Sequence, residues 1–296
     1  MRFHRSLLLA IFLAVPVLAE ELKPATVAAF DQYVSRTEQR MANEVNSGGY
    51  LWIDMVPLEQ RDDYYARLRK GEVLTKQLQT LQDGRAIPVS GGMIHHWVGL
   101  VFIPGASLAN TMALLQDYDQ QYKFYSPEVE QSHLIRRNGN DFHVYLRLRR
   151  KKVVTVVLDT EYEVLYTILA SDRASARSSS TRIAEVEHAG SANETEKPVG
   201  DDNGFLWRLN SYWRLWQRDG GIYVQLEAIS LTRNIPAGLG WLVRPFVTSV
   251  PQESLQFTLS RTRSNLCCMR PLQAVDSVSS ARIVSGRKPN TTEFKP

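Results

Sequence analysis

Cysteine is almost absent from this sequence. Its 296 residues include only two cysteines, Cys267 and Cys268, which are neighbours. Adjacent cysteines can close only a strained ring, so a framework of structural disulfides is excluded. We interpret the pair as two thiols at a helix end, with an intermolecular or redox-sensitive pair as the alternative.

A strong excess of either charge is also lacking. The chain has 35 basic and 31 acidic residues and a formal net charge of +4, a balance that argues against nucleic acid as a partner. It contains no Gly-x-Ser-x-Gly elbow, phosphate-binding loop, dinucleotide-binding glycine pattern or His-Glu-x-x-His motif. His95 and His96 would point to opposite faces of a strand, so they are not expected to share a metal ion. The sequence predicts no catalytic residue, no metal and no cofactor.

A long apolar run occurs only near the start of the chain. Residues 7–18 are apolar and follow Arg2 and Arg5, but the run is too short to cross a bilayer. Small residues up to Ala19 predict a signal peptide over residues 1–19, cleaved after Ala19. The mature protein is therefore expected to be soluble and exported, either to the periplasm or out of the cell.

The clearest pattern that is present is a β-hairpin. Residues 205–218 and 222–233 are rich in Trp, Tyr, Leu, Ile and Val, and the Asp219-Gly220 step between them is typical of a tight primed turn. Counting outward from this turn predicts the register of the two strands. One face would pair Trp216 with Tyr223, Arg214 with Gln225 and Tyr212 with Glu227; the other would pair Leu215 with Val224, Trp213 with Leu226 and Ser211 with Ala228.

Helices are predicted at both ends of the chain. Apolar residues at helical spacing predict an amphipathic helix over residues 24–46, which would cover the outside of the domain, and a second helix over residues 58–69. Residues 238–247 are predicted to form a short helix. Ser249, with Gln three residues later, forms a capping-box pattern and predicts the start of a longer closing helix that reaches Leu266.

Strands are predicted through the middle of the chain, together with a helix that Ser107 caps and that runs to about Tyr118. Polar residues 190–204 are expected to form a surface loop. Strands in succession, with helices before and after them, predict an α+β fold with an antiparallel sheet. The predicted strands are residues 50–55, 72–81, 93–103, 133–137, 142–150, 153–159, 162–169 and 178–187. For residues 72–81 the alternative is a continuation of the helix before them, and the interruption at Gly71 favours the strand.

This order of elements resembles the START-like, or SRPBCC, superfamily of helix-grip proteins. The matching features are the strand from Trp97 to Gly105, the helix after Ser107, the antiparallel strands that follow and the closing helix. The resemblance implies a curved antiparallel sheet wrapped around a long C-terminal helix, with a largely apolar cavity between them. In that superfamily the cavity takes lipids or other hydrophobic small molecules.

The resemblance also suggests how the chain is divided. An extra N-terminal segment with a helix and a short strand, residues 20–90, exceeds what the fold needs. The START-like ligand-binding domain would then occupy residues 91–268. Residues 269–296 lack periodicity and are predicted to be a disordered tail.

The apolar face of the hairpin is the predicted wall of the cavity. A packed core is the alternative, because the pattern does not distinguish a filled interior from a hollow one. Tyr212, Arg214 and Glu227 are interpreted as part of a solvated outer face, and as contacts for a polar group only if they turn inward. The candidate ligand-binding residues are Trp213, Leu215, Val224, Leu226, Ala228, Leu255 and Leu259.

Three functions remain open from the sequence. The first is binding of a lipid or another hydrophobic small molecule. The second is a cyclase or hydrolase of the same superfamily, with Arg214, Glu227, Tyr212 or His143 as acid and base. The third is an interaction protein that docks through its N-terminal helix and its basic residues 147–152, with peripheral contact to anionic membrane lipid.

Overall fold

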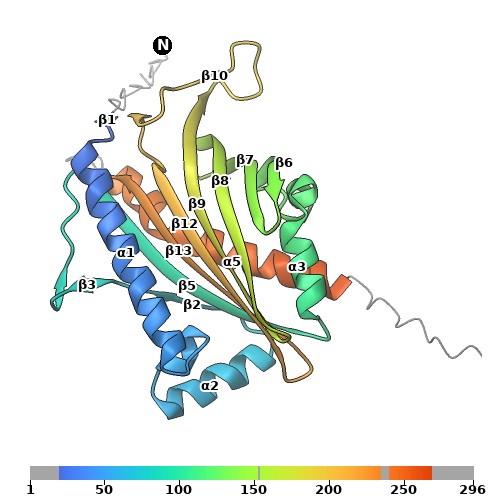
Figure 1. Ribbon diagram of the computed structural model, residues 1–296. Helices are drawn as coiled ribbons and strands as arrows, with labels where there is room; N and C mark the ends of the chain where they lie inside the picture. Colours follow the sequence, from blue (N-terminus) through green and yellow to red (C-terminus); the bar gives the residue numbers. More distant parts are fainter. Residues whose placement is uncertain (1–19, 153, 235–239, 269–296) are drawn as a thin grey trace, which may run out of the picture.

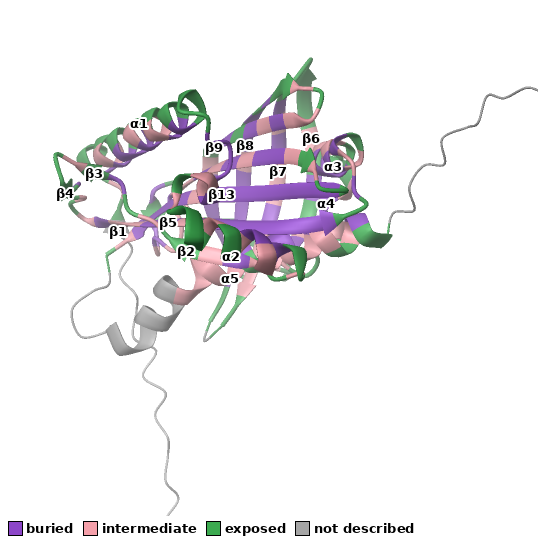
Figure 2. Cartoon of the chain, turned by 90° about the horizontal axis from the view of Figure 1, so that it is seen from below, coloured by how far each residue is buried: buried purple, intermediate pink, exposed green. Residues whose placement is uncertain are grey.

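A nine-stranded antiparallel sheet separates two layers of helix (Figures 1 and 2). The computed structural model of the protein describes residues 20–152, 154–234 and 240–268, so the predicted signal peptide and tail lie outside it. None of the helices within these residues is long and apolar enough to cross a membrane. The helices are α1 (Pro24–Asn46), α2 (Leu58–Arg69), α3 (Leu108–Gln116), α4 (Gln121–Phe124) and α5 (Gly240–Cys268), with 3-10 turns at Trp52–Met55 and Tyr118–Gln120.

The order of strands in the large sheet differs from their order in the chain. In space it runs β2 (Leu74–Gln77), β5 (Gly92–Pro104), β13 (Gly221–Arg233), β12 (Arg208–Arg218), β9 (Arg173–Glu187), β8 (Thr155–Ala170), β7 (Asp141–Lys151) and β6 (Val129–Asn138), with β10 (Thr195–Glu196) beside β9. Two short pairs lie outside it: β1 (Glu20–Glu21) with β11 (Asp201–Asp202), and β3 (Leu81–Gln82) with β4 (Arg85–Ala86).

The predicted hairpin is the pair β12 and β13, and every predicted cross-strand pair is confirmed. Asp219 and Gly220 have φ values of 56° and 72°, as a primed turn requires. The hairpin lies at the centre of the sheet, because β13 also pairs with β5 and β12 also pairs with β9. Both of its edges are therefore hydrogen-bonded to other strands.

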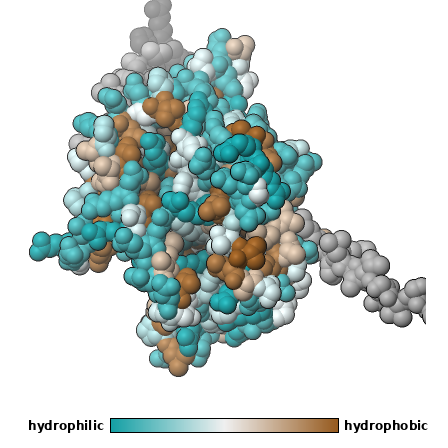
Figure 3. Space-filling view, in the orientation of Figure 1, coloured by the Kyte–Doolittle hydropathy of each residue, from teal (hydrophilic) through white to brown (hydrophobic). Residues whose placement is uncertain are grey.

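Alternation along the strands sends side chains into cores on the two sides of the sheet. On the α5 side, Leu215 and Val224 pack with Leu255 and Leu259. On the other side, Ile229 packs with residues of α1. The outward surface of the α1 side is largely hydrophilic, and its hydrophobic side chains form small separate groups (Figure 3).

Two predictions of local structure within the sheet region are wrong. Residues 50–55 are not a strand, because Asp54 Oδ2 accepts hydrogen bonds from the N–H groups of Tyr50 and Leu51 at 2.9 and 2.7 Å and closes a 3-10 turn there. The two strands predicted over 153–159 and 162–169 are one strand, β8, because Thr160 and its neighbours continue the ladder with β7. Thr160 and Glu161, between the two predicted strands, are polar but still pair with residues of β7.

The predicted break before the closing helix is also wrong. Helix α5 runs without interruption from Gly240 to Cys268, so Ser249 lies inside it rather than at its start. Residues 238 and 239 of the predicted short helix lie outside the described residues. Contact with β5 and β13 along the sheet stabilises a continuous helix, which outweighs the local capping signal.

Candidate ligand-binding site

A cavity of about 330 Å³ lies between the sheet and α5. Side chains from β5, β7, β8, β9, β12 and β13 form its wall on the sheet side, and α5 covers the opposite side. Leu, Val, Trp, Phe and Tyr dominate the lining. Pockets for small molecules have this size and this mostly apolar composition.

Small side chains make room for the cavity on the sheet. Ser178, Ser211 and Ala228 lie side by side on β9, β12 and β13, and all three line the cavity. At Gly99 on β5 the helix is much closer, because a Cβ atom there would lie 2.6 Å from Leu259 Cδ1. The helix therefore touches the sheet at Gly99 and leaves space where the small residues lie.

The structure separates the predicted cavity residues into two groups. Trp213, Leu226, Ala228 and Leu255 line the cavity. Leu215, Val224 and Leu259 lie on the same side of the sheet but pack in the core where the helix is close to the strands. Contact of the first group with a ligand stays a prediction.

Charged groups on the wall form a cluster beside α5. Glu128, Arg149 and Arg150 line the cavity together with Ser254 of the helix. Arg150 donates hydrogen bonds to Glu128 and, from Nε at 3.0 Å, to the Ser254 hydroxyl. Burial raises the pKa of Glu128 to about 7, against the opposing influence of the Arg150 charge. This cluster ties the β7 end of the sheet to α5.

The raised pKa of Glu128 gives an expected pH dependence. Because the folded protein holds this proton more tightly than the unfolded chain, the group's stabilising contribution is complete below pH 4.5 and is lost as pH rises through about 7. Glu128→Gln has no such proton. We expect the free energy of unfolding of the wild type, minus that of the variant, to fall by on the order of 1–3 kcal/mol between these pH values in urea titrations. A constant difference over this range would contradict the assignment.

The basic residues at the end of β7 are already paired with acidic side chains. Arg147 Nη2 lies 2.7 Å from Glu194 Oε1, and Lys152 Nζ lies 2.6 Å from Glu253 Oε2. Arg149 pairs with Glu130 in the same way. These ion pairs neutralise much of the charge that was expected to attract membrane lipid, and peripheral membrane contact stays a prediction.

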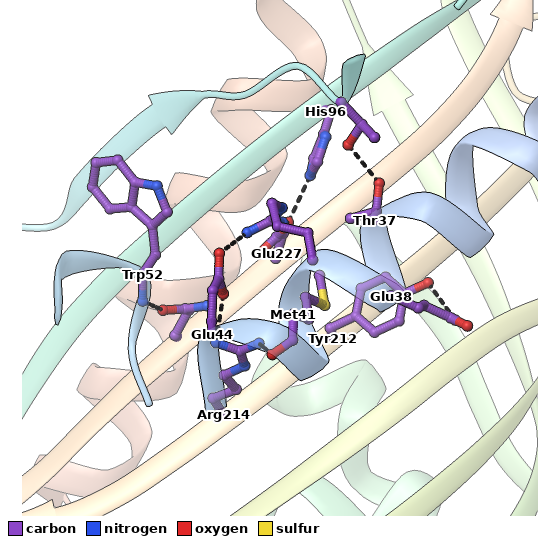
Figure 4. Close-up of polar contacts among 12 residues, drawn as sticks. Thr37, Glu38, Met41, Glu44, Trp52, His96, Tyr212, Arg214 and Glu227 are labelled. Atoms are coloured by element: carbon purple, nitrogen blue, oxygen red, sulfur yellow. Dashed lines mark hydrogen bonds and ion pairs between the residues drawn. The ribbon is translucent and has the colours of Figure 1, made fainter. Parts of the chain in front are cut away.

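The polar face of the hairpin was predicted to be solvated, and this is wrong. Tyr212, Arg214 and Glu227 are only 7%, 6% and 0% exposed, because α1 covers them (Figure 4). Arg214 Nη1 donates to Glu44 Oε2 at 3.1 Å, and Arg40 of the same helix donates to Glu227. Arg40 and Glu44 of α1 are thus each paired with a side chain of opposite charge on the sheet.

A signal for this burial was present in the sequence. The inner face of α1 is marked by Phe30, Val34, Thr37 and Met41, and Glu44 follows at the same helical spacing. An acidic residue at a buried position needs a partner of opposite charge. That requirement could have predicted a buried arginine on the sheet.

The two neighbouring histidines lie on opposite faces of β5, as predicted. His95 lines the cavity and its Nε2 lies 3.0 Å from Thr232 Oγ1. His96 lies under α1, where Nε2 lies 2.7 Å from Glu227 Oε1 and Nδ1 lies 2.9 Å from the Tyr33 hydroxyl. Within the described residues, no group of three or more His, Cys, Asp or Glu side chains is placed to hold a metal ion.

The four residues proposed as acid and base do not line the cavity. Arg214, Glu227 and Tyr212 are buried beneath α1 on the other side of the sheet. His143 is on the outer face of β7, where Nε2 lies 3.1 Å from Glu161 Oε2. A cyclase or hydrolase activity in this cavity would therefore need other groups.

Comparison with known proteins gives matches among solved structures only, since no family model and no curated protein matches the chain. A STAR-related lipid transfer protein from Xanthomonas axonopodis is 18% identical, with a TM-score of 0.41 over 65% of this chain and 98% of its own. The Zhui aromatase/cyclase from a Streptomyces species is 11% identical, with a TM-score of 0.38 over 59% of this chain and 94% of its own. Human STARD10 is 11% identical, with a TM-score of 0.38 over 70% of this chain and 80% of its own.

The predicted fold class is confirmed by the structure itself, in which a curved antiparallel sheet wraps around a long C-terminal helix and an extra N-terminal helix covers the outside (Figure 1). The chain has a helix-grip arrangement, with an antiparallel sheet around a long C-terminal helix.

Proposed function

We propose that this protein binds a lipid or another hydrophobic small molecule in the cavity between the sheet and α5. The cavity of about 330 Å³ and its mostly apolar lining support this function. Each Å² of apolar ligand surface removed from water contributes roughly 25 cal/mol to binding. The protein would hold its ligand mainly by burial, with no chemical step.

We also propose that the protein acts outside the cytoplasm, in the periplasm or after secretion. The basic start and apolar run within residues 1–19 support a cleaved signal peptide. An intact mass equal to that of a chain that begins at Glu20 would agree with this. A mass that retains the apolar run would contradict it.

Filling the cavity tests the proposed function. Ala228→Phe places a large ring on the cavity wall, beside Ser211. We expect the wild type, purified from its native compartment and extracted with organic solvent, to yield one hydrophobic species in near-stoichiometric amount. The variant should yield at most about a tenth as much, because losing the space for the ligand costs more than about 1.4 kcal/mol of binding. Mass spectrometry of the extracts measures both amounts.

The matched control is the same substitution at an exposed alanine, Ala192→Phe. It should leave the extracted species unchanged. Circular dichroism and the unfolding midpoint of both variants show whether the fold is intact. A wild-type protein that yields no specific species in repeated extractions, or a folded Ala228→Phe variant that retains its full load, would contradict binding in this cavity.

A further inference from the structure

Three of the four tyrosine hydroxyl groups on the cavity wall are already bonded to other protein groups. Tyr118 and Tyr166 share a hydrogen bond of 2.8 Å, and the Tyr166 hydroxyl also lies 3.1 Å from the Leu115 carbonyl oxygen. Tyr125 bonds to the Thr262 hydroxyl at 3.0 Å. These tyrosines present mainly their rings to the cavity.

Tyr162 is different. It lies on β8, lines the cavity and is only 5% exposed, yet its hydroxyl has no hydrogen-bond partner among the described residues. The nearby Thr160 hydroxyl donates its own hydrogen bond to the Leu146 carbonyl oxygen at 2.6 Å. An unsatisfied buried hydroxyl costs stability, and almost all such groups in proteins are paired. A ligand oxygen that reached this hydroxyl from the cavity would satisfy it.

The other polar groups of the cavity are poorly suited to a charged ligand. Arg150 is bonded to Glu128 and Ser254, and Arg149 is paired with Glu130. Burial lowers the pKa of His95 to about 4, so this ring is neutral at pH 7. Burial also raises the pKa of Tyr162 to about 12, with a smaller opposing effect of Thr160, so its hydroxyl keeps its proton. An ionised ligand group would have to break an existing ion pair.

We propose that the ligand is an uncharged hydrophobic molecule that carries a hydroxyl or carbonyl oxygen, and that the Tyr162 hydroxyl binds this oxygen inside the cavity. This inference rests on the proposed function and adds the chemical class of the ligand. Among hydrophobic molecules of similar shape, Tyr162 would favour those that carry such an oxygen. Small hydroxyl-bearing and apolar side chains around it, including Ser178 and Val164, would admit the rest of the molecule.

Three probes of similar shape test the proposal: 2-naphthol, 2-methylnaphthalene and 2-naphthoate. Their dissociation constants are measured by fluorescence titration on the wild type, Tyr162→Phe and Tyr145→Phe; Tyr145 is not part of the cavity lining. Comparing the ratio of the constants for 2-naphthol and 2-methylnaphthalene between proteins cancels the different hydration of the two probes. We expect this ratio to shift against 2-naphthol by about three- to tenfold in Tyr162→Phe, as the loss of one hydrogen bond predicts, and to stay unchanged in Tyr145→Phe.

Stability gives a second readout. Tyr162→Phe should keep or raise the unfolding midpoint, because the lost hydroxyl had no partner, whereas Tyr145→Phe removes an existing hydrogen bond to Asp159 and should lower it. An unchanged probe ratio in a folded Tyr162→Phe variant would overturn the role of Tyr162 and leave the proposed function standing. Binding of 2-naphthoate as tight as that of 2-naphthol would overturn the uncharged ligand class. Failure of all three probes to bind the wild type would overturn both this inference and the cavity-binding function.

Discussion

Arg214→Ala is expected to lower the free energy of unfolding by about 3–5 kcal/mol, as removal of one member of a buried ion pair does. Arg214 Nη1 donates to Glu44 Oε2 at 3.1 Å and to the Tyr50 carbonyl oxygen at 2.8 Å, and Nη2 donates to the Met41 carbonyl oxygen at 3.2 Å. The truncation leaves these acceptors buried between α1 and the sheet. Urea denaturation at pH 7 measures the loss.

Charge balance is the reason for so large an effect. The buried group contains two arginines, Arg40 and Arg214, and two glutamates, Glu44 and Glu227. Without Arg214 one negative charge is left uncompensated in a site where Glu227 is already fully buried. Replacing Glu44 or Glu227 by a neutral residue as well would restore the charge balance.

Arg177→Ala is the matched control. Arg177 lies opposite Tyr212 on the neighbouring strand β9, and its Nε donates to Glu38 of the same helix at 2.6 Å. Its side chain is 56% exposed, so we expect a loss below about 1 kcal/mol. Equal small losses for the two variants would contradict a stabilising role for the buried network. If Arg177→Ala alone lowered the free energy of unfolding strongly, the exposed ion pair would hold α1 against the sheet, and the buried network would not.

Local signals predicted the hairpin and the N-terminal helices closely. The Asp219-Gly220 turn fixes the register of β12 and β13 without help from the rest of the fold. Helix α1 begins at Pro24 and ends at Asn46, as predicted, because its apolar spacing and the Gly48 that follows it are both local features. Such elements are encoded by neighbouring residues and can be found from a single sequence.

The environment of the hairpin could not be found in the same way. Alternation shows that Arg214 and Leu215 point to opposite sides, but it does not show what covers each side. A half-exposed sheet was the simpler interpretation, and it failed because α1 brings Arg40 and Glu44 against the polar face. Glu44, the partner of the buried charge on Arg214, lies 170 residues away in the chain.

Whether the interior was hollow was likewise beyond the sequence. The cavity depends on small residues that become neighbours only when β9, β12 and β13 pair, such as Ser178 beside Ser211. The pattern identified the correct face, since Trp213, Leu226, Ala228 and Leu255 line the space. It did not separate them from Leu215, Val224 and Leu259, because the distance between helix and sheet changes along the strands.

The close contact at Gly99 leads to the second large expected effect. Leu259 is fully buried on α5, and Leu259→Ala should lower the free energy of unfolding by about 2–5 kcal/mol. Gly99→Ala should also destabilise the wild type, by about 1–3 kcal/mol, because the new methyl group would lie 2.6 Å from Leu259 Cδ1. In the Leu259→Ala background the same methyl group enters vacated space. Two atoms of Leu255 would still lie 3.1 Å from it, but the contact with Leu259 is removed, so we expect Gly99→Ala to cost less there than in the wild type.

Urea denaturation of the two single variants and the double variant gives a coupling energy, which we expect to exceed about 1 kcal/mol. Leu266→Ala is the control, because this leucine is also buried on α5 and packs in the same core but is not among the atoms nearest to Gly99. Its effect should add to that of Gly99→Ala. Additive effects at Leu259 as well would mean that the helix is not held against the sheet at Gly99. The close contact that separates the packed end of the domain from its cavity would then be absent.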